Sequence, residues 1–306
     1  MARTGSHQLE QLLASCRYEV LPTASAEEAV LASVPADVTI AVTVSPAKGL
    51  GPTLLLAGRL AAGGYTAVPH VSARLIRDRQ HLADIVAELR EYGVTNVFVP
   101  AGDADPAAGP FPSALSLLEA LDDMGRPFAE VGVTGYPQSH PLISDDVTVQ
   151  AMWDKRQYAT YLVSNLCFDA VALRRWIARI RARGVDLPLY VGLAGPIDRT
   201  KLLAIATKIG VAESSRFLAG HAAWFMRLAT PGAYDPQRLL GRTRSAITGA
   251  GSAVAGLHFF TFNQVKLTEQ WRQDLLSRSA GHSLAQIPQR AAAGEPGRTA
   301  EARPGG

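Results

Sequence analysis

Short apolar runs recur along the chain, and amphipathic segments separate them. The runs lack strict alternation of apolar and polar residues, which is typical of parallel strands that are buried on both faces. We therefore predict eight strands, at residues 16–21, 38–44, 65–71, 96–100, 128–133, 161–165, 187–191 and 256–262.

The segments between these runs have helical periodicity, and the last gap is long enough for two helices. Gly93 and Gly184 follow two of the segments, as glycine often does at helix C-termini, and Pro52 suits the first turn of another. We predict helices at residues 26–33, 52–62, 79–92, 113–124, 169–183, 201–209, 213–226 and 236–249.

Eight such β-α units without a hairpin signal favour an α/β fold, a single (βα)8 TIM barrel, over an open doubly wound sheet. The chain has 306 residues, of which 47% are hydrophobic, so it can bury a large core. We expect a flexible lead at residues 1–10, a catalytic barrel at 11–278, and a disordered tail at 279–306. The tail is rich in Ala, Gly, Pro and Arg and has few large apolar side chains.

Charge and composition exclude several classes of protein. Thirty Lys and Arg against 27 Asp and Glu give a net charge of +3, and the basic residues are dispersed, so we expect no nucleic-acid partner. The N-terminus lacks the apolar stretch of a signal peptide and no window resembles a membrane span, so we expect a cytoplasmic protein without a membrane partner. The two cysteines lie in strand-like runs, and no His or Cys spacing indicates a metal site.

In a barrel of this type the functional side chains lie at the C-terminal ends of the strands. Glu19 is a carboxylate within an apolar strand, where burial is expected to raise its pKa toward that of a general acid. The alternative is a structural pair with an arginine. Asp103 follows the fourth strand and Gly102, so it suits either a ligand site or a turn that caps the next segment.

Other polar residues cluster at the same strand ends. His70 ends the third strand and His140 follows the fifth, and at such positions a histidine serves as a satisfied core group or as a site residue. Uncharged polar side chains from several strands suit a flat heteroaromatic ligand such as a pterin or a flavin. They are Thr43, Asn165, His258, Thr261, Asn263 and Gln264. These residues alone do not name a reaction.

A series of short motifs carries a family resemblance. In order, they are Tyr-Glu-Val-Leu-Pro at 18–22, Ala-Val-Thr at 41–43, Val-Pro-His-Val at 68–71, Gly-Val-Thr-Asn at 93–96, Gly-Asp at 102–103, Gly-Tyr-Pro-Gln-Ser-His-Pro at 135–141, Asn-Leu-Cys-Phe-Asp at 165–169, Gly-Leu-Ala-Gly-Pro-Ile at 192–197 and His-Phe-Phe-Thr-Phe-Asn at 258–263. Each motif is weak alone, but together the chain resembles the 5,10-methylenetetrahydrofolate reductase family over nearly the whole barrel.

The resemblance implies reduction of 5,10-methylenetetrahydrofolate to 5-methyltetrahydrofolate. Glu19 matches the acid that opens the bridging ring, and Asp103 matches the carboxylate that binds the pterin and stabilises the iminium cation. Asn165 and Gln264 fall at folate-side positions. The resemblance places the cofactor-side residues at Thr43, His70, Tyr136 and Lys155.

Departures from the family pattern fall on its flavin contacts. Ala101 stands where the family has an arginine, and Pro112 stands near a tyrosine position. The family also has an Asp and a Lys on the helix before the sixth strand, and in this chain only Lys155 plausibly matches that motif. Each lost charged contact to a diphosphate costs roughly 1.5 to 3 kcal/mol. We therefore expect NADH or NADPH as hydride donor with FAD weakly held or absent. A standard FAD-dependent reductase and a non-catalytic folate-binding barrel remain as alternatives.

Overall fold

The computed structural model describes residues 2–45, 47–137, 145–198, 200, 230, 235–249 and 251–284. Within these, eight strands form one sheet in the order β3-β2-β1-β8-β7-β6-β5-β4, and neighbouring strands in this order pair in parallel. The strands are β1 (Arg17–Val20), β2 (Thr39–Val42), β3 (Ala67–Pro69), β4 (Asn96–Phe98), β5 (Glu130–Gly135), β6 (Tyr161–Ser164), β7 (Leu189–Ala194) and β8 (Val254–Phe260).

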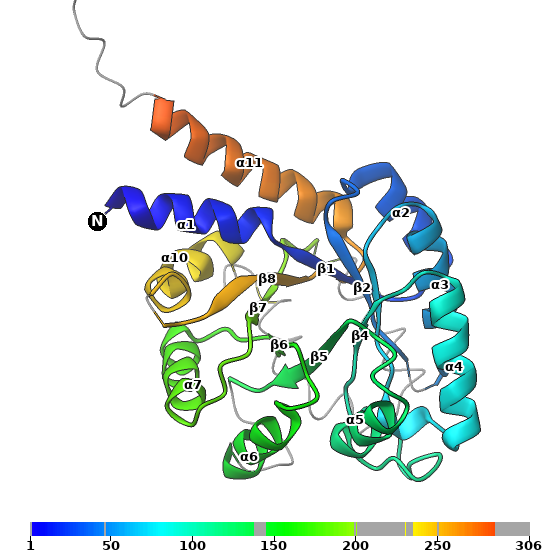
Figure 1. Cartoon of the computed structure of the whole chain (residues 1–306). Coiled ribbons are helices and arrows are strands. Elements are labelled where there is room, and N and C mark those ends of the chain that lie inside the picture. The colour runs from blue at the N-terminus through cyan, green and yellow to red at the C-terminus, as the bar shows by residue number, and fades with distance from the viewer. Residues whose placement is uncertain are drawn as a thin grey trace, which may run out of the picture.

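The two edge strands meet and nearly close the sheet into a barrel. A parallel bridge joins His70 to Phe98, and the Val71 amide donates a hydrogen bond to the Phe98 carbonyl at 2.8 Å. The helices surround the strands (Figure 1). The prediction of a TIM barrel is therefore confirmed, and all eight predicted strands overlap the observed ones.

The helices agree with the sequence pattern where that pattern is strong. They are α1 (Ala2–Ala14), α2 (Ala26–Ser33), α3 (Gly51–Ala62), α4 (Arg79–Glu91), α5 (Ala114–Asp123), α6 (Asp145–Lys155), α7 (Ala170–Ala182), α10 (Pro236–Ile247) and α11 (Val265–Leu284), with a 3-10 turn η1 at Ala73–Leu75. The predicted helices at 201–209 and 213–226 lie outside the described residues.

Three helices depart from the expectations. The lead expected to be flexible is helical from Ala2, and the end of α1 places Leu12 and Leu13 in the core. Helix α6 was absent from the pattern, and α11 continues beyond residue 279, where we expected the tail to begin. The buried face of α11 includes Thr268, Glu269 and Arg272, so apolar periodicity does not reveal it.

Alternation along β1 sends its side chains to two different places. Arg17 and Glu19 point into the barrel, whereas Tyr18 packs on the outer face. There the Tyr18 hydroxyl donates to Glu269 Oε2 at 2.6 Å, and Arg272 binds both carboxylate oxygens of Glu269 at 2.8 and 2.9 Å. The Tyr18 hydrogen bond therefore ties β1 to α11, and the buried ion pair within α11 holds the carboxylate that accepts it.

The N-terminal end of the barrel is closed by a polar cluster around Arg17, which we call the basal plug. Its guanidinium lies 4.1 Å from the ring centre of Tyr161 and 3.7 Å from that of Tyr190. It also lies 3.8 Å from Glu130, and the Tyr161 hydroxyl donates to Asn96 at 2.8 Å. Stacked, paired groups at this end of a barrel serve stability.

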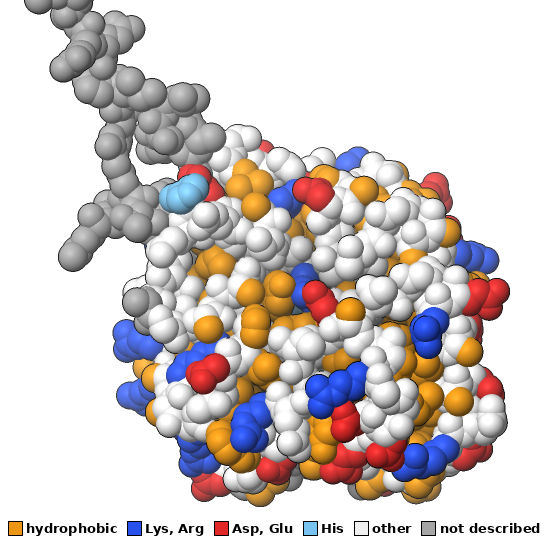
Figure 2. All heavy atoms as spheres, in the orientation of Figure 1, with side chains coloured by type: hydrophobic (Ala, Val, Ile, Leu, Met, Phe, Trp, Pro, Cys, Tyr) orange, Lys and Arg blue, Asp and Glu red, His pale blue; other side chains and the backbone are white. Residues whose placement is uncertain are grey.

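The molecular surface has mixed charge. Figure 2 shows acidic and basic side chains interspersed over the visible face, without a patch of one sign. In the part of the chain that the structure describes, no helix is long and apolar enough to cross a membrane. Among the same residues, no group of three or more His, Cys, Asp or Glu side chains is placed to hold a metal ion.

Candidate active site

Glu19 lies inside the barrel between two histidines. Its Oε2 is 3.2 Å from Nε2 of His258 on β8 and 3.7 Å from Nε2 of His70, which follows β3. The Glu19 side chain is 18% exposed, and both imidazoles are buried. Three segments distant in sequence thus bring one carboxylate and two imidazoles together, and only the His258 contact is within hydrogen-bond distance.

The electrostatics correct the expectation for Glu19. Burial raises the pKa of its carboxyl, but the hydrogen bond from His258 and the charges of His70 and His258 outweigh burial and lower the pKa below its usual value. Burial lowers the pKa of His70 to about 4, although Glu19 opposes this shift. At neutral pH the carboxyl of Glu19 is therefore ionised and His70 is neutral.

His258 has an unusual environment for a histidine. It is 2% exposed, and its Nδ1 has no hydrogen-bond partner among the described residues. The ring of Phe260, on the same face of β8, packs edge-on against it at 5.0 Å between ring centres. The sequence indicated His258 as a polar group at the strand end, but it did not indicate that Glu19 is its partner.

Asp103 lies on the loop that follows β4 and is exposed. Its neighbour Gly102 has φ +87°, and a Cβ there would lie 1.8 Å from Ser72 Oγ, so this position favours glycine. Burial raises the pKa of Tyr136, and the Asp103 carboxylate raises it further. The charge of Asp103 therefore acts on Tyr136, and a shared site for the two residues stays a prediction.

Arg74 holds the loop that carries Asp103. Its Nε donates to the Ala104 carbonyl at 2.5 Å, and its two terminal nitrogens donate to the Pro112 carbonyl at 3.2 Å and to Asp105 at 3.3 Å. The guanidinium is thus engaged by the protein itself. Its role in the structure is to shape the loop.

Two of the amide side chains predicted for the ligand accept hydrogen bonds from backbone amides, and their role toward a ligand stays a prediction. The Gln264 oxygen accepts a hydrogen bond from the Asp198 amide at 2.7 Å, which ties the loop after β7 to the start of α11. The Asn165 oxygen accepts from the amide of Leu166 at 2.9 Å. Thr43 is half-buried just after β2, where the hydroxyl of Thr53 donates to its carbonyl.

Two further polar residues of the sequence analysis join β8 to β1. The Thr261 hydroxyl donates to the Glu19 carbonyl at 2.6 Å. Asn263 accepts from the Leu21 amide at 2.7 Å and donates to the Leu21 carbonyl at 3.1 Å. These bonds fix the end of β1, and with it the backbone that carries Glu19. His140 lies outside the described residues.

Lys155 lies apart from the other predicted site residues. It is the last residue of α6, which returns from the C-terminal to the N-terminal end of the barrel, and the following chain enters β6 at Tyr161. Lys155 is buried, and burial lowers its pKa to about 8. The structure therefore does not bring Lys155 to Glu19 or Asp103, and its position does not support a cofactor contact there.

An apolar cluster near the C-terminal ends of β6, β7 and β8 was not predicted. It consists of Leu166, Ala194, Phe168, Ile197, Phe260 and Phe262. Phe260 connects it to His258 and so to Glu19. The sequence signal was the pair of aromatic residues on either side of Thr261. Half-buried aromatic rings beside a carboxylate can bind a flat heteroaromatic ligand.

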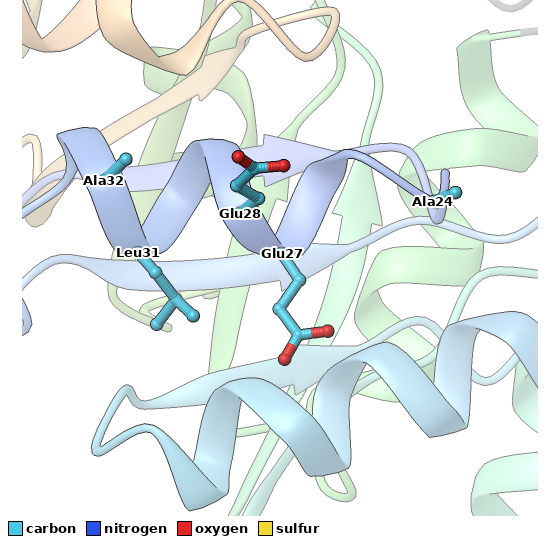
Figure 3. A pocket seen from close by; sticks show the side chains of 5 residues that line it. All are labelled: Ala24, Glu27, Glu28, Leu31 and Ala32. Carbon is cyan, nitrogen blue, oxygen red and sulfur yellow. The ribbon is translucent and has the colours of Figure 1, made fainter.

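A shallow hollow lies elsewhere, on the outside of α2. It has a volume of about 490 Å³ and is lined by Ala24, Glu27, Glu28, Leu31 and Ala32 (Figure 3). Glu27 forms an ion pair there with Arg59 of α3 at 3.2 Å. The hollow contains none of the predicted site residues, so we assign the chemistry to the barrel interior.

Comparison with known proteins settles the family. The family model of methylenetetrahydrofolate reductase matches residues 58–214, just over half of the chain. The chain belongs to the methylenetetrahydrofolate reductase family. The matched range includes Asp103, Tyr136 and Asn165, whereas Glu19 and His258 lie outside it.

Individual relatives of this reductase-family chain are distant. Methylenetetrahydrofolate reductase 2 of Saccharomyces cerevisiae is 27% identical over 101 residues, which cover 31% of this chain and 17% of that protein. Two solved structures are similar in outline. Dihydropteroate synthase of Yersinia pestis has a TM-score of 0.45 and 12% identity, covering 88% of this chain and 93% of its own. A putative phosphonomutase of Burkholderia cenocepacia J2315 has a TM-score of 0.43 and 11% identity. The match covers 93% of this chain and 98% of the phosphonomutase chain.

Proposed function

We propose that the chain reduces 5,10-methylenetetrahydrofolate to 5-methyltetrahydrofolate, with NADH or NADPH as the hydride donor and without tightly bound flavin. The observation that carries the proposal is the Glu19 carboxylate, held in the barrel interior 3.2 Å from His258. Family membership supports the reaction class. The nicotinamide donor and the absence of tight flavin binding are part of the proposal.

Each candidate residue has a distinct part in this reaction. A proton delivered through Glu19 lets the bridging ring open, because the leaving nitrogen accepts the proton as its bond to the methylene carbon breaks. The ionised carboxylate of Asp103 favours the iminium cation that forms. Hydride from the reduced nicotinamide then converts the methylene carbon to a methyl group. The apolar cluster around Phe260 supplies a surface for a flat ring.

The residues that we compared with the family's flavin contacts do not fit a flavin diphosphate. Ala101 and Pro112 carry no charge, and Lys155 lies at the opposite end of the barrel. Arg74 is close to this loop, but its guanidinium donates to Ala104, Pro112 and Asp105. An arginine already bound in this way offers little to a phosphate. The proposed reaction therefore has no flavin step.

The visible spectrum of the purified protein, followed by anaerobic oxidation of NADH and NADPH, tests the proposal. We expect no flavin band, and we expect nicotinamide oxidation that requires methylenetetrahydrofolate and yields one 5-methyltetrahydrofolate per nicotinamide. A stoichiometric flavin, or turnover that requires added FAD, would establish the FAD-dependent alternative. Folate binding without nicotinamide oxidation would establish the non-catalytic barrel.

A further inference from the structure

His258 is enclosed in the barrel with only one of its two ring nitrogens bonded. Nε2 lies 3.2 Å from Glu19 Oε2, and Nδ1 has no partner among the described residues. A buried polar atom without a partner lowers stability, and such atoms are rare in folded proteins. The packing of β8 among the described residues does not explain why this nitrogen is unpaired.

The groups around His258 identify its proton partner. Glu19 and Arg17 face it from β1, and His70 faces it from the end of β3. On the other side, the register pairs His258 with Gly192 of β7, which has no side chain. Arg17 is held by the basal plug, and His70 is beyond hydrogen-bond distance of Glu19. Glu19 is therefore the group with which His258 shares a proton.

We propose that His258 is a positioning residue that supplies Glu19 with the proton for ring opening. This inference rests on the proposed function. In the loaded state both ring nitrogens carry a proton, and the imidazolium donates through Nε2 to the Glu19 carboxylate. The Nε2 proton passes to Oε2 and then to the leaving nitrogen of the folate. The bond between that nitrogen and the methylene carbon breaks, and both bonding electrons stay on the nitrogen.

The proton that leaves for the folate nitrogen is replaced at His258. After transfer the imidazole is neutral and keeps its remaining proton on Nδ1, and one proton from solvent reloads the pair. The lowered pKa of Glu19 agrees with this arrangement, because a carboxyl that is ionised at rest needs a neighbour to hold the proton. His70, which burial keeps neutral, is a poor candidate for that task.

The first test separates orientation from proton supply. His258→Gln keeps an amide donor within reach of Glu19 but cannot be protonated at neutral pH. We expect kcat at neutral pH to fall by about tenfold to a hundredfold, the KM for folate to stay unchanged, and the descending limb of the kcat profile to move to lower pH. His258→Phe removes the donor too and should lose more activity. His7→Gln, on the exposed face of α1, is the control. A wild-type pH profile in His258→Gln would overturn the proposal.

The second test needs no turnover and so distinguishes this inference from the proposed function. Protein with nitrogen-labelled histidine is titrated by NMR, in the wild type and in Glu19→Gln. We expect the Nε2 signal of His258 to differ between the two proteins, because the Glu19 carboxylate that lies 3.2 Å from this nitrogen is gone in Glu19→Gln. Identical His258 ring signals in the two proteins would overturn the pairing whatever the activity.

Discussion

The two ends of the barrel interior hold two buried polar clusters of opposite character. In the basal plug, Arg17 is stacked between Tyr161 and Tyr190 and paired with Glu130. At the other end, Glu19 is held against two histidines, and one ring nitrogen of His258 lacks a partner in the described structure. The plug is satisfied and has the character of a structural element. The Glu19 cluster is incompletely satisfied and can exchange a proton, which is what a site requires.

If the Glu19 cluster is the site and the basal plug is structural, the substitution with the largest effect on catalysis should be at Glu19. Glu19→Gln removes the ionisable group but keeps the size of the side chain. We expect kcat to fall by about a hundredfold to ten-thousandfold without loss of the fold. Rapid-mixing kinetics and thermal unfolding measure the two properties. Glu27→Gln, on the outside of α2, is the matched control, and equal activity in both variants would remove Glu19 from the mechanism.

The same cluster should make stability depend on pH, whereas the plug should not. The pKa of His70 is about 4 in the folded chain and near 6.5 when unfolded, so the unfolded state binds more protons between these values. Stability is therefore expected to fall as pH drops from about 6.5 to about 4, by on the order of 3 kcal/mol from His70 alone. The lowered pKa of Glu19 acts in the same direction at lower pH.

Urea unfolding at a series of pH values measures this dependence. His70→Gln should flatten the curve between pH values of about 4 and 6.5, because the group that titrates there is gone. His7→Gln removes an exposed histidine and should leave the curve as in the wild type. A His70→Gln curve as steep as that of the wild type would place the titration elsewhere.

Arg17→Met tests the plug as a structural element. The change removes a buried charge together with its stacking on two tyrosines, and we expect a loss of about 2 kcal/mol in the free energy of unfolding. The exposed Arg90→Met should stay within about 0.5 kcal/mol of the wild type. Activity per folded molecule should stay near that of the wild type. A large fall in kcat without a loss of stability would show that the basal plug contributes to catalysis as well as to the fold.

The smallest effect is expected at Gly102. Alanine there would adopt a positive φ and place its Cβ against Ser72 Oγ, which we expect to cost about 1 kcal/mol. The loop that carries Asp103 would shift, so the KM for folate should rise more than stability falls. Gly64→Ala also has positive φ but has open space around the Cβ, so it reports the backbone cost alone. Equal KM changes in both variants would argue against a site at Asp103.

Local pattern and motif order predicted the barrel and the position of Glu19, but not the surroundings of Glu19. Its partner His258 is 239 residues away, and nothing in either segment indicates that they meet. The expected rise in the pKa of Glu19 was wrong for this reason. Lys155 was selected by its motif, and only the return direction of α6 indicates that it lies toward the N-terminal end of the barrel. Helix α11 was missed because its buried face carries Glu269 and Arg272.

Strand β1 has four residues and three separate tasks. Arg17 belongs to the basal plug, Tyr18 binds Glu269 of α11, and Glu19 lies at the candidate site. Because neighbouring side chains point to opposite faces, an insertion or deletion of one residue would exchange all three environments together. We expect a deep mutational scan to show β1 as the segment least tolerant of length changes. Designs that graft a new activity onto this scaffold should therefore keep β1 intact and vary the loops.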